Sequence, residues 1–250
     1  MAGLSSTRMD GHPWLLRQIG RALAVCLLIL AGALWYGQTG ASLSVSNSYV
    51  SDYLIAAPRW PWLVVACFCF AVVLMLLAFG FLLRAESSPL VLLGCACMAA
   101  SSMGVFFMAY APVRHAEQPP AVPHAFWTPQ WWFTSKTAAT HYEKGMADAY
   151  SDMHYHASRL ALGMGVLSIL LLATGLAGTH DGRVFAKTTV IMGLVMFGLF
   201  YMANHPTGKH GLWQRSGFVV LYAWLWLARH RIVLPDGASD SEAALRKVRE

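Results

Sequence analysis

Acidic, imidazole and basic side chains stand together in the segment YSDMHYHASR, residues 150–159, directly before a long apolar run. On a continuous helix, Asp148, Asp152 and His156 are spaced four residues apart and therefore lie along one face. Arg159 falls close to that face, whereas His154 lies about 200° around the helix axis from Asp152. Carboxylate and imidazole groups in such a stripe can bind a polar molecule, exchange protons as acid and base, or hold a metal ion.

Other polar residues flank the remaining apolar runs on the same predicted side of the chain. Arg215 stands at the start of the last run, where an arginine at the rim of a membrane span needs a partner, and we expect Asp52 or Asp152. If the apolar runs pack as a bundle, these groups meet in one polar vestibule. The candidate vestibule residues are Ser51, Asp52, Asp148, Asp152, His156, His205, His210 and Arg215.

Three interpretations of these residues remain open from the sequence. They could be solvated helix ends whose surface pairs contribute only a few tenths of a kcal/mol. They could line a metal-free vestibule, or they could bind a metal ion. We expect no metal and no cofactor, because the chain has no HExxH or paired-cysteine pattern and its five cysteines all lie in apolar runs. A triad of Ser51, His156 and Asp152 lacks the nucleophile-elbow pattern that would support it.

Composition predicts the elements that must position these groups. Of the 250 residues, 57% are hydrophobic and 12% are charged, against roughly a quarter charged in soluble domains. Six apolar stretches approach the length of about 20 residues that crosses a bilayer as a helix. We therefore predict an all-α polytopic membrane protein, a bundle of six transmembrane helices. The predicted spans are near 19–36, 61–83, 89–111, 158–178, 186–203 and 212–228, and the last is the weakest because Gln214 and Arg215 intrude.

Arginine and lysine are more frequent in the segments that lie inside if the N-terminus is cytoplasmic, which predicts both termini inside. The membrane domain then covers residues 1–231, with outer loops at about 37–60 and 112–157, and residues 232–250 form a polar cytoplasmic tail. WTPQWWF, residues 127–133, suits the membrane surface, and the residues after it have helix-forming composition that runs into the fourth span. The net charge of +6 is scattered, so we expect membrane lipid as a partner and no nucleic acid.

At VSDYLIAAPRWPWL, HYHASRLALGMGVL and GLWQRSGFVVLYAWLWLA the chain resembles a bacterial family of six-span membrane proteins known as domain of unknown function 998. The resemblance covers about residues 19–230 and implies a location in the bacterial cytoplasmic membrane. It singles out Ser51, Asp52, His156, Gly211 and Arg215. The second outer loop is longer than the resemblance leads us to expect.

The leading hypothesis is a membrane protein whose outward-facing polar vestibule binds a lipid headgroup or a small polar molecule. The first alternative is a membrane-embedded lipid hydrolase or transferase, possible with or without a metal, that uses Asp152 and His156 as base or ligands. The second alternative is a non-catalytic assembly or scaffold protein. Transport is disfavoured, since the spans lack polar groups at the membrane midplane.

Overall fold

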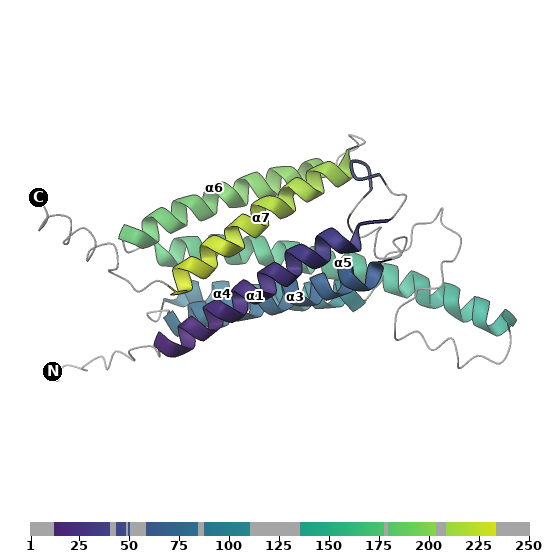
Figure 1. The fold of residues 1–250 in the computed structure, drawn as a ribbon, viewed down its shortest axis with the longest axis horizontal. Helices are drawn as coiled ribbons and strands as arrows, with labels where there is room; N and C mark the ends of the chain where they lie inside the picture. The colour runs from purple at the N-terminus through teal and green to yellow at the C-terminus, as the bar shows by residue number, and fades with distance from the viewer. Residues whose placement is uncertain are drawn as a thin grey trace, which may run out of the picture.

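The structure, a computed structural model, describes residues 13–40, 44–48, 50, 59–84, 88–110, 136–177, 180–203 and 209–233. Every regular element in these ranges is an α-helix (Figure 1). In chain order the helices are α1 (Pro13–Gly37), α3 (Trp60–Arg84), α4 (Pro89–Tyr110), α5 (Lys136–Leu176), α6 (His180–Ala203) and α7 (His210–Val233). Of α5, the side chains are described only from Met153 onward, without Tyr155.

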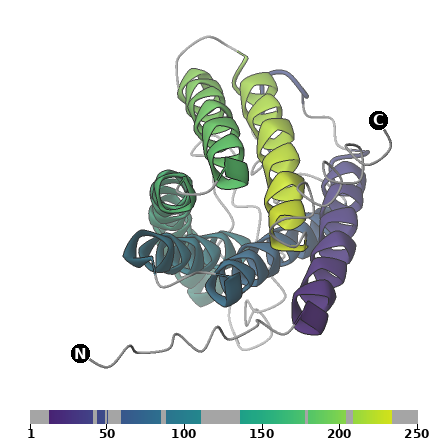
Figure 2. The same ribbon diagram turned by 90° about the vertical axis from the view of Figure 1, so that its left-hand side faces the viewer.

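Helices that follow one another in the chain run in opposite directions along a shared axis (Figures 1 and 2). The start of α1 lies against the ends of α3 and α7, since Gly20 faces Val233 and Gly80 faces Ile232. We call this the basic end, because seven arginine and lysine residues lie there: Arg17, Arg21, Arg84, Arg183, Lys187, Arg229 and Arg231. The opposite end holds the end of α1 and the starts of α3 and α7.

Proline residues explain where several helices begin, and apolar composition explains why the chain stays helical along each run. Pro13 and Pro89 open α1 and α4, and Pro61 is the second residue of α3. Proline suits the first turn of a helix, since its missing N–H would have no partner there. Between these starts and the polar ends the runs are almost entirely apolar. In a bilayer the helix satisfies every backbone group internally, so long apolar runs of this kind fold as helices.

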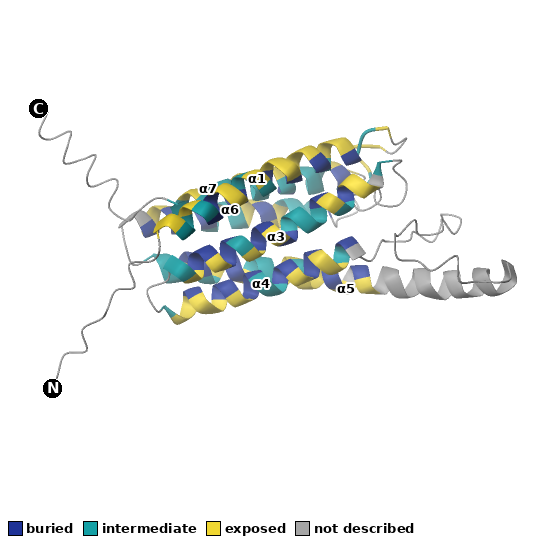
Figure 3. Ribbon diagram, turned by 60° about the horizontal axis from the view of Figure 1, so that its bottom comes forward, coloured by how far each residue is buried: buried dark blue, intermediate teal, exposed yellow. Residues whose placement is uncertain are grey.

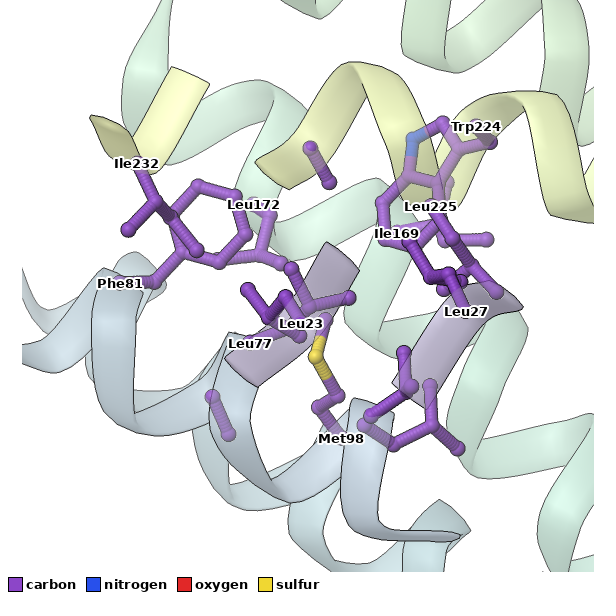
Figure 4. Packing of buried hydrophobic residues seen from close by; sticks show 14 of the residues in the cluster. Leu23, Leu27, Leu77, Phe81, Met98, Ile169, Leu172, Trp224, Leu225 and Ile232 are labelled. Carbon is purple, nitrogen blue, oxygen red and sulfur yellow. The ribbon is translucent and has the colours of Figure 1, made fainter. Parts of the chain in front are cut away.

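The core lies along the bundle axis and draws on all six helices. Leu23, Leu77 and Leu172 are almost completely buried and come from α1, α3 and α5, respectively; Trp224 of α7 is buried in the same cluster (Figure 4). Each helix also has an exposed face (Figure 3), and large hydrophobic residues are among those exposed on every helix. Leu194 on α6, for example, is 65% exposed. Apolar side chains on both faces are what a helix bundle embedded in lipid requires.

Small residues let α4 and α5 approach closely. A Cβ on Gly104 would lie 2.7 Å from the Ala161 nitrogen and 2.8 Å from the Ala157 oxygen, both backbone atoms of α5. Nearby, the Ser101 hydroxyl donates a hydrogen bond of 2.8 Å to the Ala161 carbonyl. Close backbone approach and hydroxyl-to-carbonyl bonds hold membrane helices together where no hydrophobic force acts between them. This contact positions the part of α5 that carries the predicted stripe.

Five helices are long and apolar enough to cross a membrane: Pro13–Gly37, Pro61–Arg84, Pro89–Ala109, His156–Leu176 and Gly182–Ala203. The sixth predicted span forms the helix α7, yet it does not reach that apolarity. Its run is interrupted by Gln214, Arg215 and Arg229 and is rich in tryptophan and tyrosine. Within the bundle, α7 is bound to its neighbours by polar contacts. Trp224 Nε1 donates to Thr189 Oγ1 at 3.2 Å, and the Tyr222 hydroxyl donates to the Leu27 carbonyl at 3.1 Å.

The predicted all-α bundle is confirmed, and so is the helix that runs into the fourth span. α5 is continuous from Lys136 to Leu176, and its first half extends beyond the other helices (Figure 1). The first residue of α1 and the last of α7 lie at the same end of the bundle, as a six-helix alternation requires. The segment WTPQWWF and the tail after residue 233 lie outside the described residues. Which end faces the cytoplasm remains a prediction.

Candidate binding site at the start of α7

Arg215 ties the start of α7 to the end of α1 and to the segment after it. Its Nε donates to Gln38 Oε1 at 3.0 Å. Its Nη1 donates to two backbone carbonyls, those of Val45 at 2.7 Å and Ser48 at 2.8 Å. A guanidinium presents several donors in a fixed fork, and here they bind three oxygens from residues that are distant in the sequence. Arg215 therefore orders the loop that follows α1.

The neighbouring residues of GLWQR hold the same loop. A Cβ on Gly211 would lie 2.6 Å from the Val45 carbonyl oxygen and closer still to that of Ser48, so only glycine permits this approach. The Leu212 amide donates to the Ser46 carbonyl at 3.0 Å, and Gln214 Oε1 accepts from the Val50 amide at 2.7 Å. We call residues 44–48 and Val50 together with Gln38, Gly211, Leu212, Gln214 and Arg215 the clamp, and the end of the bundle that carries them the clamp end.

An aromatic and cationic cluster lies beside the clamp on α1 and α3. The Arg59 guanidinium stacks over the Tyr36 ring at 4.3 Å from its centroid and also donates to Thr39 Oγ1. The Tyr36 ring meets that of Trp62 edge-on, with centroids 5.5 Å apart. Such rings suit the boundary between lipid and water. The clamp end therefore has the chemistry of a membrane surface.

The predicted carboxylate partner of Arg215 is not among the contacts described above. Asp52 and the side chain of Asp152 lie outside the described residues, so this pairing remains a prediction. His210 has a structural contact: its Nδ1 donates to the Ala203 carbonyl at 2.7 Å. That bond satisfies a carbonyl at the end of α6 and joins it to the start of α7.

On α5, Asp148, Asp152 and His156 belong to one continuous helix, as the predicted stripe requires. The side chain of His156 is exposed, whereas that of His154 is buried, with 5% exposure. The imidazole that enters the interior is thus the one that lies off the predicted stripe. Ser51, His205 and the carboxyl groups of Asp148 and Asp152 lie outside the described residues, so whether they converge with Arg215 stays a prediction.

Metal binding finds no support in the described part of the chain. No three His, Cys, Asp or Glu side chains there lie close enough together to hold a metal ion. The expectation of a metal-free site remains a prediction, since the acidic side chains lie outside that part.

Two residues of this end were not predicted from the sequence. Gln38 is a neutral amide just after the first apolar run, with no ionisable group to mark it. Trp213 lies inside the motif GLWQR, and its indole nitrogen is buried and has no hydrogen-bond acceptor among the described residues. The signal available was the clustering of amide and indole donors around an arginine at the mouth of a span.

The helical fold, the apolar outer faces and the five membrane-length helices define a multi-pass integral membrane protein. Residues 22–230 match the family described as "Protein of unknown function (DUF998)". The chain belongs to that family, as the motifs GLWQR and HYHASR suggested. No curated protein and no solved structure matches the chain.

Proposed function

We propose that this integral membrane protein binds the polar headgroup of a lipid, or a small molecule of the same chemistry, in a vestibule at the clamp end. The clamp supplies a fixed wall built from the end of α1, its loop and the start of α7. The vestibule faces away from the cytoplasm in this proposal. Fewer basic residues lie at the clamp end, where Arg59, Lys136, Lys144, Arg159, Lys209 and Arg215 stand against the seven of the basic end.

The observation that carries the proposal is the indole of Trp213. A buried donor without an acceptor costs about 1–3 kcal/mol, so a structure retains one where water or a ligand oxygen can reach it. Trp213 lies two residues from Arg215, whose Nε and Nη1 already donate to Gln38, Val45 and Ser48. A phosphodiester or hydroxyl oxygen would satisfy this donor. The ligand class is therefore one rich in acceptor oxygens.

The buried imidazole of His154 is a second polar group at the clamp end, and it supports placing the vestibule there. α5 brings it to the level of Ala157 and Ala161, which pack on Gly104 near the clamp end of α4. Buried polar groups are rare in membrane helices and mark binding sites when they gather at one level. The two buried polar groups are the His154 imidazole on α5 and the Trp213 indole on α7, so they come from two helices on different sides of the bundle.

A thermal-shift experiment on the full chain in detergent tests this function. Glycerophosphoglycerol and glycerophosphoethanolamine serve as soluble headgroup probes. A probe that binds the folded state raises the unfolding temperature, with stabilisation of about 2.7 kcal/mol at 100 times its dissociation constant. Trp213→Phe keeps an aromatic ring but removes the donor, so it should weaken the shift by roughly tenfold in probe concentration.

Trp35→Phe is the matched control, because Trp35 lies near the same end and is 79% exposed. It should leave the shift unchanged. If neither probe stabilises the parent protein, or if both variants respond like the parent, the vestibule does not bind a headgroup through Trp213.

A further inference from the structure

Arg229 near the end of α7 is fixed in place at the basic end, opposite to the clamp. Its Nε donates to the Gly20 carbonyl at 2.6 Å, and its guanidinium lies 5.1 Å from the centroid of the Trp226 ring. Gly20 is buried against Val233, so α1 and α7 are in direct contact there. Within the described part of the chain the two terminal nitrogens of Arg229 bind no acceptor. The geometry thus holds a guanidinium at the α1–α7 junction with its terminal donors available.

Arg17 and Arg21 flank Gly20 on α1, and both are exposed. They are four residues apart and therefore lie on one face of the helix, about 60–100° around the axis from Gly20. Neither has an ion-pair partner among the described residues. Arg229 thus binds the Gly20 carbonyl, and Arg17 and Arg21 lie within one helical turn of Gly20, without a described counter-charge. Like charges at such spacing repel one another, so an anion at this position would stabilise the arrangement.

The face of α1 that carries these arginines continues as an apolar stripe. Val25 and Leu28 follow Arg21 at helical spacing and are 56% and 64% exposed. Further along the same face lies Trp35. From Arg17 to Trp35 the helix rises by about 27 Å, close to the hydrocarbon thickness of about 30 Å. This one face therefore has cations at one membrane surface, apolar side chains through the interior and an aromatic ring at the other surface.

We propose that the α1–α7 junction at the basic end binds an anionic phospholipid. Its phosphodiester binds Arg17, Arg21 and Arg229, and an acyl chain lies along Val25 and Leu28. Guanidinium groups bind phosphate oxygens through paired, charge-assisted hydrogen bonds. Clusters of arginine between helices at a membrane surface are typical sites for anionic headgroups. The apolar stripe directly beyond the cations favours a lipid over a free anion, because an inorganic phosphate would leave that stripe without a role.

The test uses the full chain, purified in a mild detergent, stripped of lipid and titrated separately with phosphatidylglycerol and phosphatidylcholine. Native mass spectrometry counts the lipid retained. The parent should retain phosphatidylglycerol in clear preference. R17Q/R21Q should weaken that retention by about 25-fold, from roughly fivefold per arginine near an anionic surface. Both residues are exposed, so the double variant should fold normally, and its circular dichroism checks this.

R183Q/K187Q is the matched control. It removes the same charge from exposed positions at the same end, on α6, and should retain phosphatidylglycerol within about twofold of the parent. Equal losses in both double variants would mean that general electrostatics, not this junction, holds the lipid. Displacement of phosphatidylglycerol by inorganic phosphate at equal concentration would also overturn the proposal, as would equal retention of phosphatidylcholine. A change of oligomeric state in R17Q/R21Q without a lipid preference would assign this face to a second copy.

This inference does not rest on the vestibule at the clamp end. The loss caused by R17Q/R21Q should therefore appear in the Trp213→Phe background as well. A parent that fails to bind headgroup probes at the clamp end would leave the lipid preference of the basic end intact.

Discussion

At the scale of single residues, the start of α7 depends on one arginine and one glycine. Arg215 gathers oxygens from Gln38 and from two backbone carbonyls of the loop after α1. Gly211 lets that loop come close enough for the bonds to form. The two residues stand four apart on α7 and therefore share a face. Each needs the other, since the carbonyls that clash with a Cβ at residue 211 are those that Arg215 binds.

Arg215→Ala should destabilise the protein by roughly 3 kcal/mol. It leaves two loop carbonyls and an amide without a charged donor, and such bonds contribute about 1.5–3 kcal/mol each before compensation by water. Arg183→Ala, an exposed position on α6, is the control and should change little. Unfolding in mixed detergent micelles, followed by circular dichroism, measures both. Equal small effects would show that Arg215 merely reaches water and does not hold the loop.

Gly211→Ala should cost about 2 kcal/mol, because the new methyl group meets backbone carbonyl oxygens that have little room to retreat. Gly32→Ala is the matched control: a Cβ at Gly32 has nothing within 4 Å. That change should be neutral or stabilise by up to about 1 kcal/mol, as alanine is the better helix former. The same unfolding assay compares the pair. A neutral Gly211→Ala would mean that the loop does not rest on the start of α7.

At the scale of helices, the closest approach of two backbones occurs where glycine stands at the contact. α4 and α5 meet through Gly94, Gly104 and Gly175: a Cβ at Gly94 would lie 3.0 Å from the Leu172 side chain, and a Cβ at Gly104 or Gly175 would lie 2.7 Å from the nearest atom of the other helix. The Ser101 hydroxyl bonds to the Ala161 carbonyl across this contact, and on the other side of α4 the Ser102 hydroxyl bonds to Ala71 of α3 at 2.7 Å. The contact between α4 and α5 fixes α5 close to the position where His154 is buried.

Gly104→Ala should separate α4 from α5 and destabilise the fold by about 1–3 kcal/mol, because the clash is with backbone atoms. Gly163→Ala on α5, where a Cβ has nothing within 4 Å, should not. Protease accessibility of the α4–α5 pair in detergent and the unfolding temperature both report the difference. If the two variants behave alike, the helices are not in the close contact described.

At the scale of the whole molecule, the six helices leave a clamp end and a basic end with different chemistry. One carries amides, an indole donor, aromatic rings and a tied-down loop, and the other carries most of the described arginines. This polarity along the axis suits a protein that holds one orientation in its membrane. It also separates the two proposed lipid contacts, a headgroup in the clamp-end vestibule and an anionic phospholipid at the junction of α1 and α7.

Accessibility labelling tests the orientation. In a background without native cysteines, Asn47→Cys at the clamp end should react with a membrane-impermeant maleimide in intact cells. His230→Cys at the basic end should react only after permeabilisation, because the basic end is predicted to be cytoplasmic. Both residues are exposed. If only His230→Cys reacts in intact cells, the orientation of the protein is the opposite of the predicted one. If both variants react in intact cells, α7 does not cross the membrane.

The sequence by itself determined the elements. The length of an apolar run and the positions of proline and charge are local properties, and they decide where a helix starts, ends and enters lipid. They predicted six helices, the continuation of α5 into its outer extension and the weakness of the last span. The motif GLWQR likewise pointed to a special position for Gly211 and Arg215.

Only the tertiary structure decided what those residues touch. Arg215 and Val45 are 170 residues apart, and Arg229 and Gly20 are 209 apart. Such pairs depend on which helix faces come together, and backbone carbonyls carry no sequence signal that could name them as partners. The sequence could predict only an acidic partner for Arg215, because an ionisable group is visible in a sequence and an oriented carbonyl is not; that acidic pairing remains a prediction beside the carbonyl contacts of Arg215. The burial of His154 could not be predicted either. Helix periodicity gives the angular order of residues around the axis, but the packing of α4 against α5 decides which side of α5 is buried.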